Sequence, residues 1–193
     1  MLYVSLGAVI VALAYFGWKL TARSAYESAE YTVPESDGVF EIREYPDLMM
    51  ATTNTQFESQ GDDGSFMRLF RYISGENQAE RKVAMTTPVF MLRDAEETPD
   101  QMGFVIPKAI VEQQIPKPVE GKVRIQERRG GRFAVIRFDG RLNSVSFARA
   151  DERLRTWMST KGLVGEENAE SAGYDPPWTP GPLRRNEVLI RLQ

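Results

Sequence analysis

The residue types that most often do chemistry in proteins are scarce in this chain. Its 193 residues include no histidine and no cysteine, which excludes Ser-His-Asp and Cys-His catalysis, the usual zinc ligand sets and iron–sulfur clusters. Catalysis would have to use Asp, Glu, Lys, Tyr or Ser. Glu44 and Glu127 occupy equivalent positions in the internal repeat described below and could form a carboxylate acid/base pair. Nothing in the sequence places a substrate between them, so we do not expect a hydrolase or metalloenzyme.

The charge balance argues against a nucleic acid partner. The chain has 24 Lys and Arg against 27 Asp and Glu, a net charge of −3, whereas binding to a phosphate backbone needs a basic excess. With 42% apolar residues, the composition and length fit one globular domain with a substantial core. The sequence identifies no protein partner.

The first eighteen residues form an uncharged and mostly apolar run. Its length is at the short end of what crosses a bilayer, roughly 17–25 residues, and Lys19 and Arg23 follow it. We predict a single-pass membrane anchor, with the domain on the cytoplasmic side because the basic residues follow the run.

The anchor prediction sets the domain layout, and two alternatives to it stay open. We assign residues 1–23 to the anchor, 24–30 to a tether and 31–193 to the domain. A buried core helix is one alternative. The other is a signal peptide cleaved near Ala22-Arg23-Ser24, which would place the domain in the periplasm or outside the cell.

Hydrophobic periodicity predicts an α+β domain. Period-two alternation predicts strands, and an apolar stripe of helical period predicts two helices, from about residue 66 to 75 and from about 143 to 160. The predicted strands lie at 40–45, 48–55, 83–92, 102–106, 123–127, 133–138 and 188–192.

A shift of 83 residues superimposes the two halves of this pattern. It relates strands to strands and places the first helix inside the second, which predicts two strand-strand-helix-strand-strand halves joined in one antiparallel sheet or barrel. The aligned pairs are Phe40 and Val123, Ile42 and Ile125, Glu44 and Glu127, Ala51 and Ala134, Val105 and Val188, and Ile106 and Leu189.

Seven short segments make a more specific series, in which Met-Thr-x-Pro at Met85 and Gly-Tyr-Asp-Pro-Pro at Gly173 are the most distinctive. The segments are FEIREY at 40–45, FMRLFRYISG at 66–75, KVAMTTPV at 82–89, GFVIP at 103–107, VRIQER at 123–128, GYDPPW at 173–178 and RRNEV at 184–188. In this order, over roughly residues 31–193, they resemble the SOUL haem-binding protein family.

The resemblance implies a distorted antiparallel β-barrel built from two pseudo-symmetric halves and flanked by two helices. It also implies an open apolar groove beside the first helix, in which haem or another tetrapyrrole is held reversibly by a carrier, buffer or sensor rather than by an enzyme. The same architecture resembles bacterial effector-binding domains, so an effector-binding or protein-interaction module is the alternative. An enzyme acting on a tetrapyrrole is a third hypothesis, for which the sequence offers no catalytic constellation.

With this groove in mind, one face of the predicted first helix becomes a candidate ligand wall. The face carries Phe66, Leu69, Phe70 and Ile73. The alternative is that these four residues belong only to the hydrophobic core. Met85 would contact the macrocycle, or simply fill an irregular gap in a strand. A histidine axial ligand has been proposed for some family members, but this chain has none. We therefore expect haem to bind without strong axial ligation and without a metal site of the protein's own.

Cationic and loop residues complete the candidate site. Arg68, Arg71 and Lys82 are candidates to pair with the propionates, or else belong to a solvated face. Tyr174 and Trp178 lie in a proline-rich loop that either closes the fold or covers the groove. We further expect Arg184, Arg185 and Glu187 to form ion pairs with Asp175, which lies in the same loop.

Overall fold

The computed structural model describes residues 27–55, 64–92, 101–119, 121, 123–175 and 179–193. The predicted anchor and Trp178 lie outside these residues. In the part of the chain that the structure describes, no helix has the length and apolar character needed to cross a membrane.

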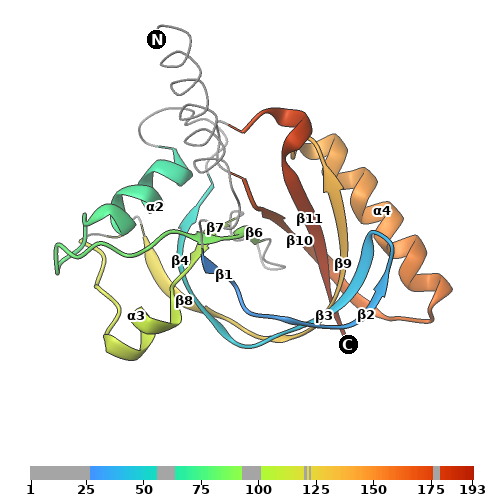
Figure 1. Cartoon of the computed structure of the whole chain (residues 1–193), viewed down its shortest axis with the longest axis horizontal. Helices are drawn as coiled ribbons and strands as arrows, with labels where there is room; N and C mark the ends of the chain where they lie inside the picture. The colour runs from blue at the N-terminus through green and yellow to red at the C-terminus, as the bar shows by residue number, and fades with distance from the viewer. Residues whose placement is uncertain (1–26, 56–63, 93–100, 120, 122, 176–178) are drawn as a thin grey trace, which may run out of the picture.

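A nine-stranded antiparallel sheet forms the body of the domain (Figure 1). Its two end strands, β2 and β8, do not pair with each other, so the sheet curls without closing. The predicted barrel is therefore corrected to a strongly curved open sheet, since closure needs hydrogen bonds between the two edges. The strands in spatial order are β2 (Thr32–Asp37), β3 (Phe40–Tyr45), β9 (Gly131–Asp139), β11 (Arg185–Leu192), β10 (Gly165–Gly173), β6 (Val89–Leu92), β7 (Gln101–Val105), β4 (Leu48–Asn54) and β8 (Arg124–Arg128).

Two longer helices lie outside the curved sheet, at opposite sides of the domain, as Figure 1 shows. These are α2 (Ser65–Ser74) and α4 (Ser144–Thr160). Asn143 caps α4 by accepting a hydrogen bond of 2.9 Å from the Ser146 N–H, and the Ser146 hydroxyl accepts one of 2.9 Å from the Asn143 N–H. A short helix, α3 (Lys108–Gln113), and a 3₁₀ turn, η2 (Gly181–Leu183), were not predicted.

The strand order supports the predicted duplication. Exchanging β3 with β8, β4 with β9, β6 with β10 and β7 with β11 reverses the order of these eight strands. The register agrees, because Ile42 lies opposite Ala134 just as Ile125 lies opposite Ala51. These positions are related by the predicted shift of 83 residues.

The shift grows along each half. Leu69, Tyr72 and Ile73 are the buried residues of α2, and Leu154, Trp157 and Met158 occupy the same spacing on α4, with a shift of 85. In the last strands Phe104 lies opposite Ala51 and Ile190 opposite Ala134, a shift of 86. The second half therefore carries three more residues, and the predicted alignment of Val105 with Val188 is wrong by three positions.

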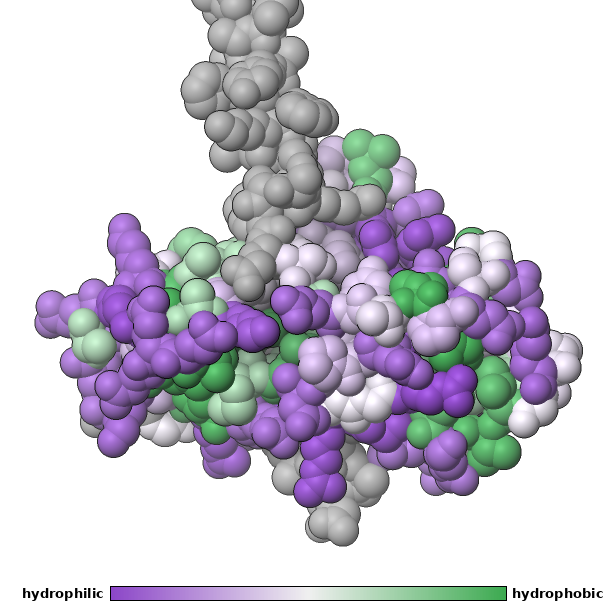
Figure 2. All heavy atoms as spheres, turned by 60° about the horizontal axis from the view of Figure 1, so that its bottom comes forward, coloured by the Kyte–Doolittle hydropathy of each residue, from purple (hydrophilic) through white to green (hydrophobic). Residues whose placement is uncertain are grey.

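Both faces of the sheet are buried over much of their area. One face packs against α2 through Leu69 and Phe104 and against α4 through Leu154 and Val188. The opposite, concave face carries its own cluster, which contains Tyr45, Met50, Phe90, Phe133 and Leu189. On the outer surface that Figure 2 presents, hydrophobic residues form several separate groups between hydrophilic ones.

The end of the predicted tether also packs against the concave face. A short strand, β1 (Glu27–Ser28), runs parallel to β5 (Thr86–Thr87). Ala29 is buried in the concave cluster, and its N–H donates a hydrogen bond of 2.8 Å to the Thr87 carbonyl. Residues just before the predicted domain boundary thus contribute to the core.

Candidate functional site

The predicted ligand wall on α2 divides into a buried part and an exposed edge. Leu69 and Ile73 are buried against the sheet. Phe66 and Phe70 stack with ring centroids 6.1 Å apart, and Phe66 also meets the ring of Phe104 edge-on at 5.4 Å. Phe70 is 40% exposed and is the one exposed aromatic side chain among the described residues. Leu69 and Ile73 are thus part of the hydrophobic core, whereas the stacked pair exposes apolar surface to solvent.

A narrow hollow adjoins the stacked pair and brings three predicted residues together. Phe66, Met85 and Tyr174 line it, beside Thr87 and Val89. Its volume of about 20 Å³ is little more than the space for one water molecule. A large flat ligand would therefore lie across the mouth of this hollow rather than inside it.

The predicted cations lie elsewhere. Arg68 and Arg71 line a hollow of about 190 Å³ on the other flank of α2, together with Val119 and Val123. Arg68 is also held there by hydrogen bonds to the Thr53 hydroxyl at 3.1 Å and the Asn54 carbonyl at 2.7 Å. A shallow hollow of about 570 Å³ adjoins this one.

Lys82 is exposed and lines neither the hollow beside Phe66 nor the one beside Arg68 and Arg71. One further hollow, of about 200 Å³, lies between β1, the start of β4 and α3 and contains none of the predicted site residues. The structure thus separates the predicted apolar and cationic groups into different places around α2.

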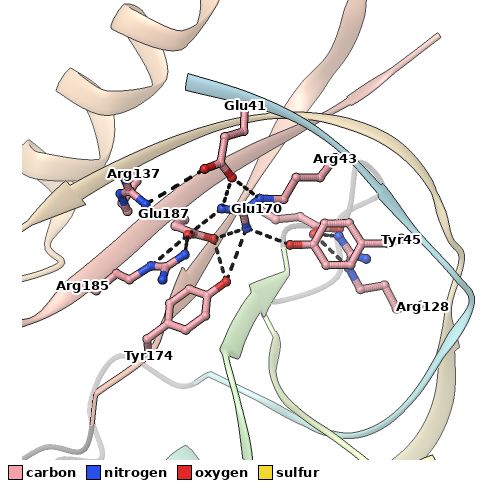
Figure 3. A network of polar contacts seen from close by, with 9 residues as sticks. All are labelled: Glu41, Arg43, Tyr45, Arg128, Arg137, Glu170, Tyr174, Arg185 and Glu187. Carbon is pink, nitrogen blue, oxygen red and sulfur yellow. Dashed lines mark hydrogen bonds and ion pairs between the residues drawn. The ribbon is translucent and has the colours of Figure 1, made fainter. Parts of the chain in front are cut away.

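Sequence reasoning missed a buried ionic network on the concave face (Figure 3). Glu187, on β11, accepts hydrogen bonds from Arg43 Nη1 at 2.7 Å and Nη2 at 2.9 Å. It also accepts bonds from Arg185 at 2.6 and 3.1 Å and from the Tyr174 hydroxyl at 2.8 Å. Both Arg43 and Glu187 are fully buried. Burial of a paired charge is sustained only when its hydrogen-bonding groups are satisfied, as they are here.

Aromatic rings enclose the guanidinium groups of this network. The Arg43 guanidinium carbon lies 4.3 Å from the centroid of the Tyr31 ring, and Arg43 Nη1 donates a bond of 3.1 Å to the Tyr45 hydroxyl. Arg128 packs against Phe133, with 4.4 Å from its guanidinium carbon to the ring centroid, and forms a 2.6 Å ion pair with Glu170. The concave face is therefore built from arginines, carboxylates and aromatic rings.

The network fixes the protonation of its members. Burial by itself raises the pKa of Glu187. The hydrogen bonds and charge of Arg43, followed by those of Arg185, lower the pKa by more than burial raises it, so the net pKa shift is downward. Burial, followed by the charge of Glu187, raises the pKa of Tyr174 well above its usual range. Burial also raises the pKa of Tyr45, to about 12. Near neutral pH the network therefore holds an ionised glutamate and neutral tyrosines.

Arg185 and Glu187 pair with each other rather than with Asp175, and Glu44 and Glu127, considered as a carboxylate pair, lie on strands that are not neighbours. Asp175 accepts a hydrogen bond of 2.6 Å from the Arg185 backbone N–H, whereas the Arg185 guanidinium pairs with Glu187. Glu44 and Glu127 are both exposed, and Glu44 lies 3.8 Å from Arg132 rather than in a carboxylate pair. Within the described residues, no group of three or more acidic side chains could hold a metal ion.

Comparison with known proteins identifies the family. The model of the SOUL heme-binding protein family matches residues 26–191. The chain is 28% identical to "Heme-binding protein 1" of Xenopus tropicalis over 161 residues, covering 80% of this chain and 84% of the relative. It is 30% identical to "Heme-binding protein 2" of Homo sapiens over 171 residues, covering 81% and 82%. The chain belongs to the SOUL heme-binding protein family, which confirms the resemblance seen in its motifs.

Solved structures share the fold at much lower sequence identity. A hydrolase from Listeria innocua superimposes with a TM-score of 0.57 at 9% identity, over 83% of this chain and 94% of that one. The C-terminal domain of EcmrR gives a TM-score of 0.53 at 14% identity, over 84% and 98%. These likenesses extend to the fold alone.

Proposed function

We propose that this protein binds haem or another tetrapyrrole reversibly and without covalent attachment, as a carrier, buffer or sensor rather than as an enzyme. Family membership and two relatives named as heme-binding proteins support the ligand class. The observation that carries the location is the stacked Phe66–Phe70 pair, in which Phe70 is exposed and Phe66 lines the hollow with Met85 and Tyr174.

In this proposal apolar contact supplies most of the affinity. The macrocycle lies across the exposed edge of Phe66 and Phe70, which removes apolar surface from water on both partners. Leu69 and Ile73 hold this edge in place from the core side. Met85 is half-buried, lines the hollow and gives a soft, polarisable contact.

The residues beside the pair fit a macrocycle better than they fit axial coordination of iron. Haem, when bound, would supply iron chemistry, for which the usual protein ligands are histidine, cysteinate, methionine or tyrosinate. The Tyr174 hydroxyl donates a hydrogen bond to Glu187, and the raised pKa of Tyr174 keeps the phenol neutral. Met85 is thus the one sulfur side chain lining the hollow that could approach the iron, and we assign it to contact with the ring.

Cationic side chains would pair with the propionates in this arrangement. Lys82 is exposed and stands three residues before Met85, a chain distance of roughly 10 Å at most. Arg68 and Arg71 line the other flank of α2. We therefore propose Lys82, the exposed cation closest to Met85 along the chain, as a partner of a propionate, with Arg68 and Arg71 able to pair with one only if the ligand extends around the helix.

Titration with hemin tests the proposal. Full-length protein in mild detergent is titrated with hemin while the Soret band is followed, with metal-free protoporphyrin measured in parallel by fluorescence. Saturable binding of both at one site supports the proposal. No binding of either ligand refutes it and favours an effector-binding or protein-interaction module, whereas consumption of the tetrapyrrole under reductant would indicate an enzyme.

We also propose that the apolar run at residues 1–18 anchors the protein in a membrane, with the domain on the cytoplasmic side. The absence of charge from the run and the presence of Lys19 and Arg23 after it support this topology. Fractionation without detergent should leave the full-length chain with the membranes. Recovery in the soluble fraction would refute the anchor, and a mature N-terminus near Ala25 would indicate secretion.

A further inference from the structure

Tyr174 belongs to two parts of the molecule at once. It lines the hollow beside Phe66 and Met85, and its hydroxyl donates a 2.8 Å hydrogen bond to Glu187 in the ionic network. Figure 3 shows the hydroxyl of Tyr174 pointing toward Glu187, between Arg185 and Tyr45. Tyr174 therefore connects the proposed ligand site with the buried charges of the concave face.

Glu187 is held so firmly that it can fix its partners. A carboxylate has about four lone-pair positions, and Glu187 accepts two bonds from Arg43, two from Arg185 and one from Tyr174. Its side chain is fully buried, so no water competes for these positions. Because the carboxylate cannot rotate without breaking these bonds, the Tyr174 hydroxyl has one place to donate.

The rest of Tyr174 is held by Arg185 as well. The Tyr174 N–H donates to the Arg185 carbonyl at 3.2 Å, and the Arg185 guanidinium carbon lies 4.3 Å from the centroid of the Tyr174 ring. Backbone, ring face and hydroxyl are thus each tied to β11.

We propose that Glu187 is a positioning residue of the ligand site, which acts through the Tyr174 hydroxyl to fix the Tyr174 ring as one wall of the hollow beside Phe66. This inference rests on the proposed function. Glu187 does not line the hollow, and in this proposal it affects tetrapyrrole affinity in addition to stabilising the fold.

The duplicated fold supplies a neutral version of the same pair. Gln126 corresponds to Arg43 by the shift of 83 residues, and Gln101 corresponds to Glu187 by the shift of 86, each in the opposite half of the fold. The Gln126 amide donates a hydrogen bond of 2.8 Å to the Gln101 side chain. This position of the fold therefore accepts an amide pair, and R43Q/E187Q removes both fully buried charges together. Arg185 and Glu41 also lose an ion-pair partner, but their side chains are 21% and 16% exposed and can reach water.

The experiment compares four variants in the full-length chain, with the dissociation constant for protoporphyrin and the urea midpoint of unfolding as readouts. Y174F keeps the ring and removes the hydroxyl, and we expect affinity to fall about tenfold, as for loss of a hydrogen bond to a charged group. R43Q/E187Q should weaken binding to a similar extent. Adding Y174F to R43Q/E187Q should weaken it no further, because both changes break the same link.

E170Q is the matched control. Glu170 forms an ion pair with buried Arg128 on the same face, and no hydrogen bond to Tyr174 is found in the described structure. This variant should lower the urea midpoint while affinity stays within about twofold of the wild type. Equal affinity of Y174F and wild type, additive losses in the triple variant, or an equal loss in E170Q would each overturn the positioning role. Absence of binding by the wild-type chain would instead overturn the proposed function, and this inference with it.

Discussion

Phe70→Glu is the variant that most directly separates a ligand wall from plain core. Phe70 is 40% exposed and stacks on Phe66, so the substitution places a carboxylate at the partly open edge of α2. A charge in a fully buried position would unfold the protein. At this edge, by contrast, the carboxylate can reach water, and the helix should survive.

The expected effect on affinity follows from the exposed area of the ring. An aromatic side chain has roughly 200 Å² of surface to bury, so the 40% of Phe70 that is exposed corresponds to roughly 80 Å² available to a ligand. At about 25 cal/mol per Å², covering this area contributes about 2 kcal/mol. Loss of that contact weakens binding about 30-fold. Repulsion between the new carboxylate and the propionates adds to the loss.

Circular dichroism and titration with protoporphyrin together measure the outcome. The matched control is Val145→Glu, which introduces the same charge at an exposed apolar position of α4, where the side chain is 68% exposed. We expect both variants to keep the wild-type helical signal and only Phe70→Glu to lose affinity. Unchanged affinity in a folded Phe70→Glu protein would refute the location of the site, and unfolding would show that Phe70 belongs to the core.

Four further outcomes are expected. Metal-free protoporphyrin should bind within about tenfold of hemin, a difference of about 1.4 kcal/mol, and Met85→Ala should weaken both ligands alike. Much tighter hemin binding with a low-spin spectrum would instead show an axial ligand. Leu69→Ala should lower the free energy of unfolding by about 2–5 kcal/mol in urea titrations, because Leu69 is fully buried. The lowered pKa of Glu187 contributes stability above its unfolded value of about 4.3, and thermal unfolding should show this stability lost as the pH falls below that value. The raised pKa of Tyr174 has the opposite sign, so the stability it contributes is present below about pH 10 and lost as the pH rises further, and Y174F should reduce that alkaline loss.

Hydrophobic periodicity was sufficient to predict the strands and helices in which the apolar residues of the sequence are the buried ones. The alternation in residues 40–45 predicted β3, and the apolar stripe from Phe66 to Ile73 predicted α2, whose observed bounds are Ser65–Ser74 against a predicted range of about 66 to 75. The repeat predicted the two halves, and the strand register supports it. In these segments local pattern and tertiary packing demand the same conformation.

Elements with a weak local pattern could not be predicted. The sequence of β10, GEENAESAG, lacks the β-branched and aromatic residues typical of strands. It forms a strand because β11 and β6 pair with it on its two sides, so the partners rather than the residues decide. The short β2 is exposed along its whole length and is likewise defined by pairing with β3.

The ionic network was missed because alternation of apolar and polar residues along a strand indicates that only one face of the strand is buried. In β3, Ile42 faces α4, and the alternation therefore predicts that Arg43, on the other face, is exposed to solvent. The sheet curls so far that Arg43 is buried on the concave face as well. Such curvature depends on strand pairings distant in sequence, which one strand cannot reveal.

The duplication also bears on why an aromatic pair stands exposed on α2. By the shift of 85 that matches the buried residues of the two helices, Asp151 and Arg155 on α4 correspond to Phe66 and Phe70. Those two residues form an ion pair of 3.0 Å between partly exposed side chains, an ordinary arrangement four residues apart on a helix surface. The fold is therefore compatible with polar side chains at this edge, and folding alone gives no reason for an exposed phenylalanine there. Exposed aromatic surface that the architecture does not require is what a binding site for a flat apolar ligand would need. Among the residues that the structure describes, the α2 half provides such surface and the α4 half does not.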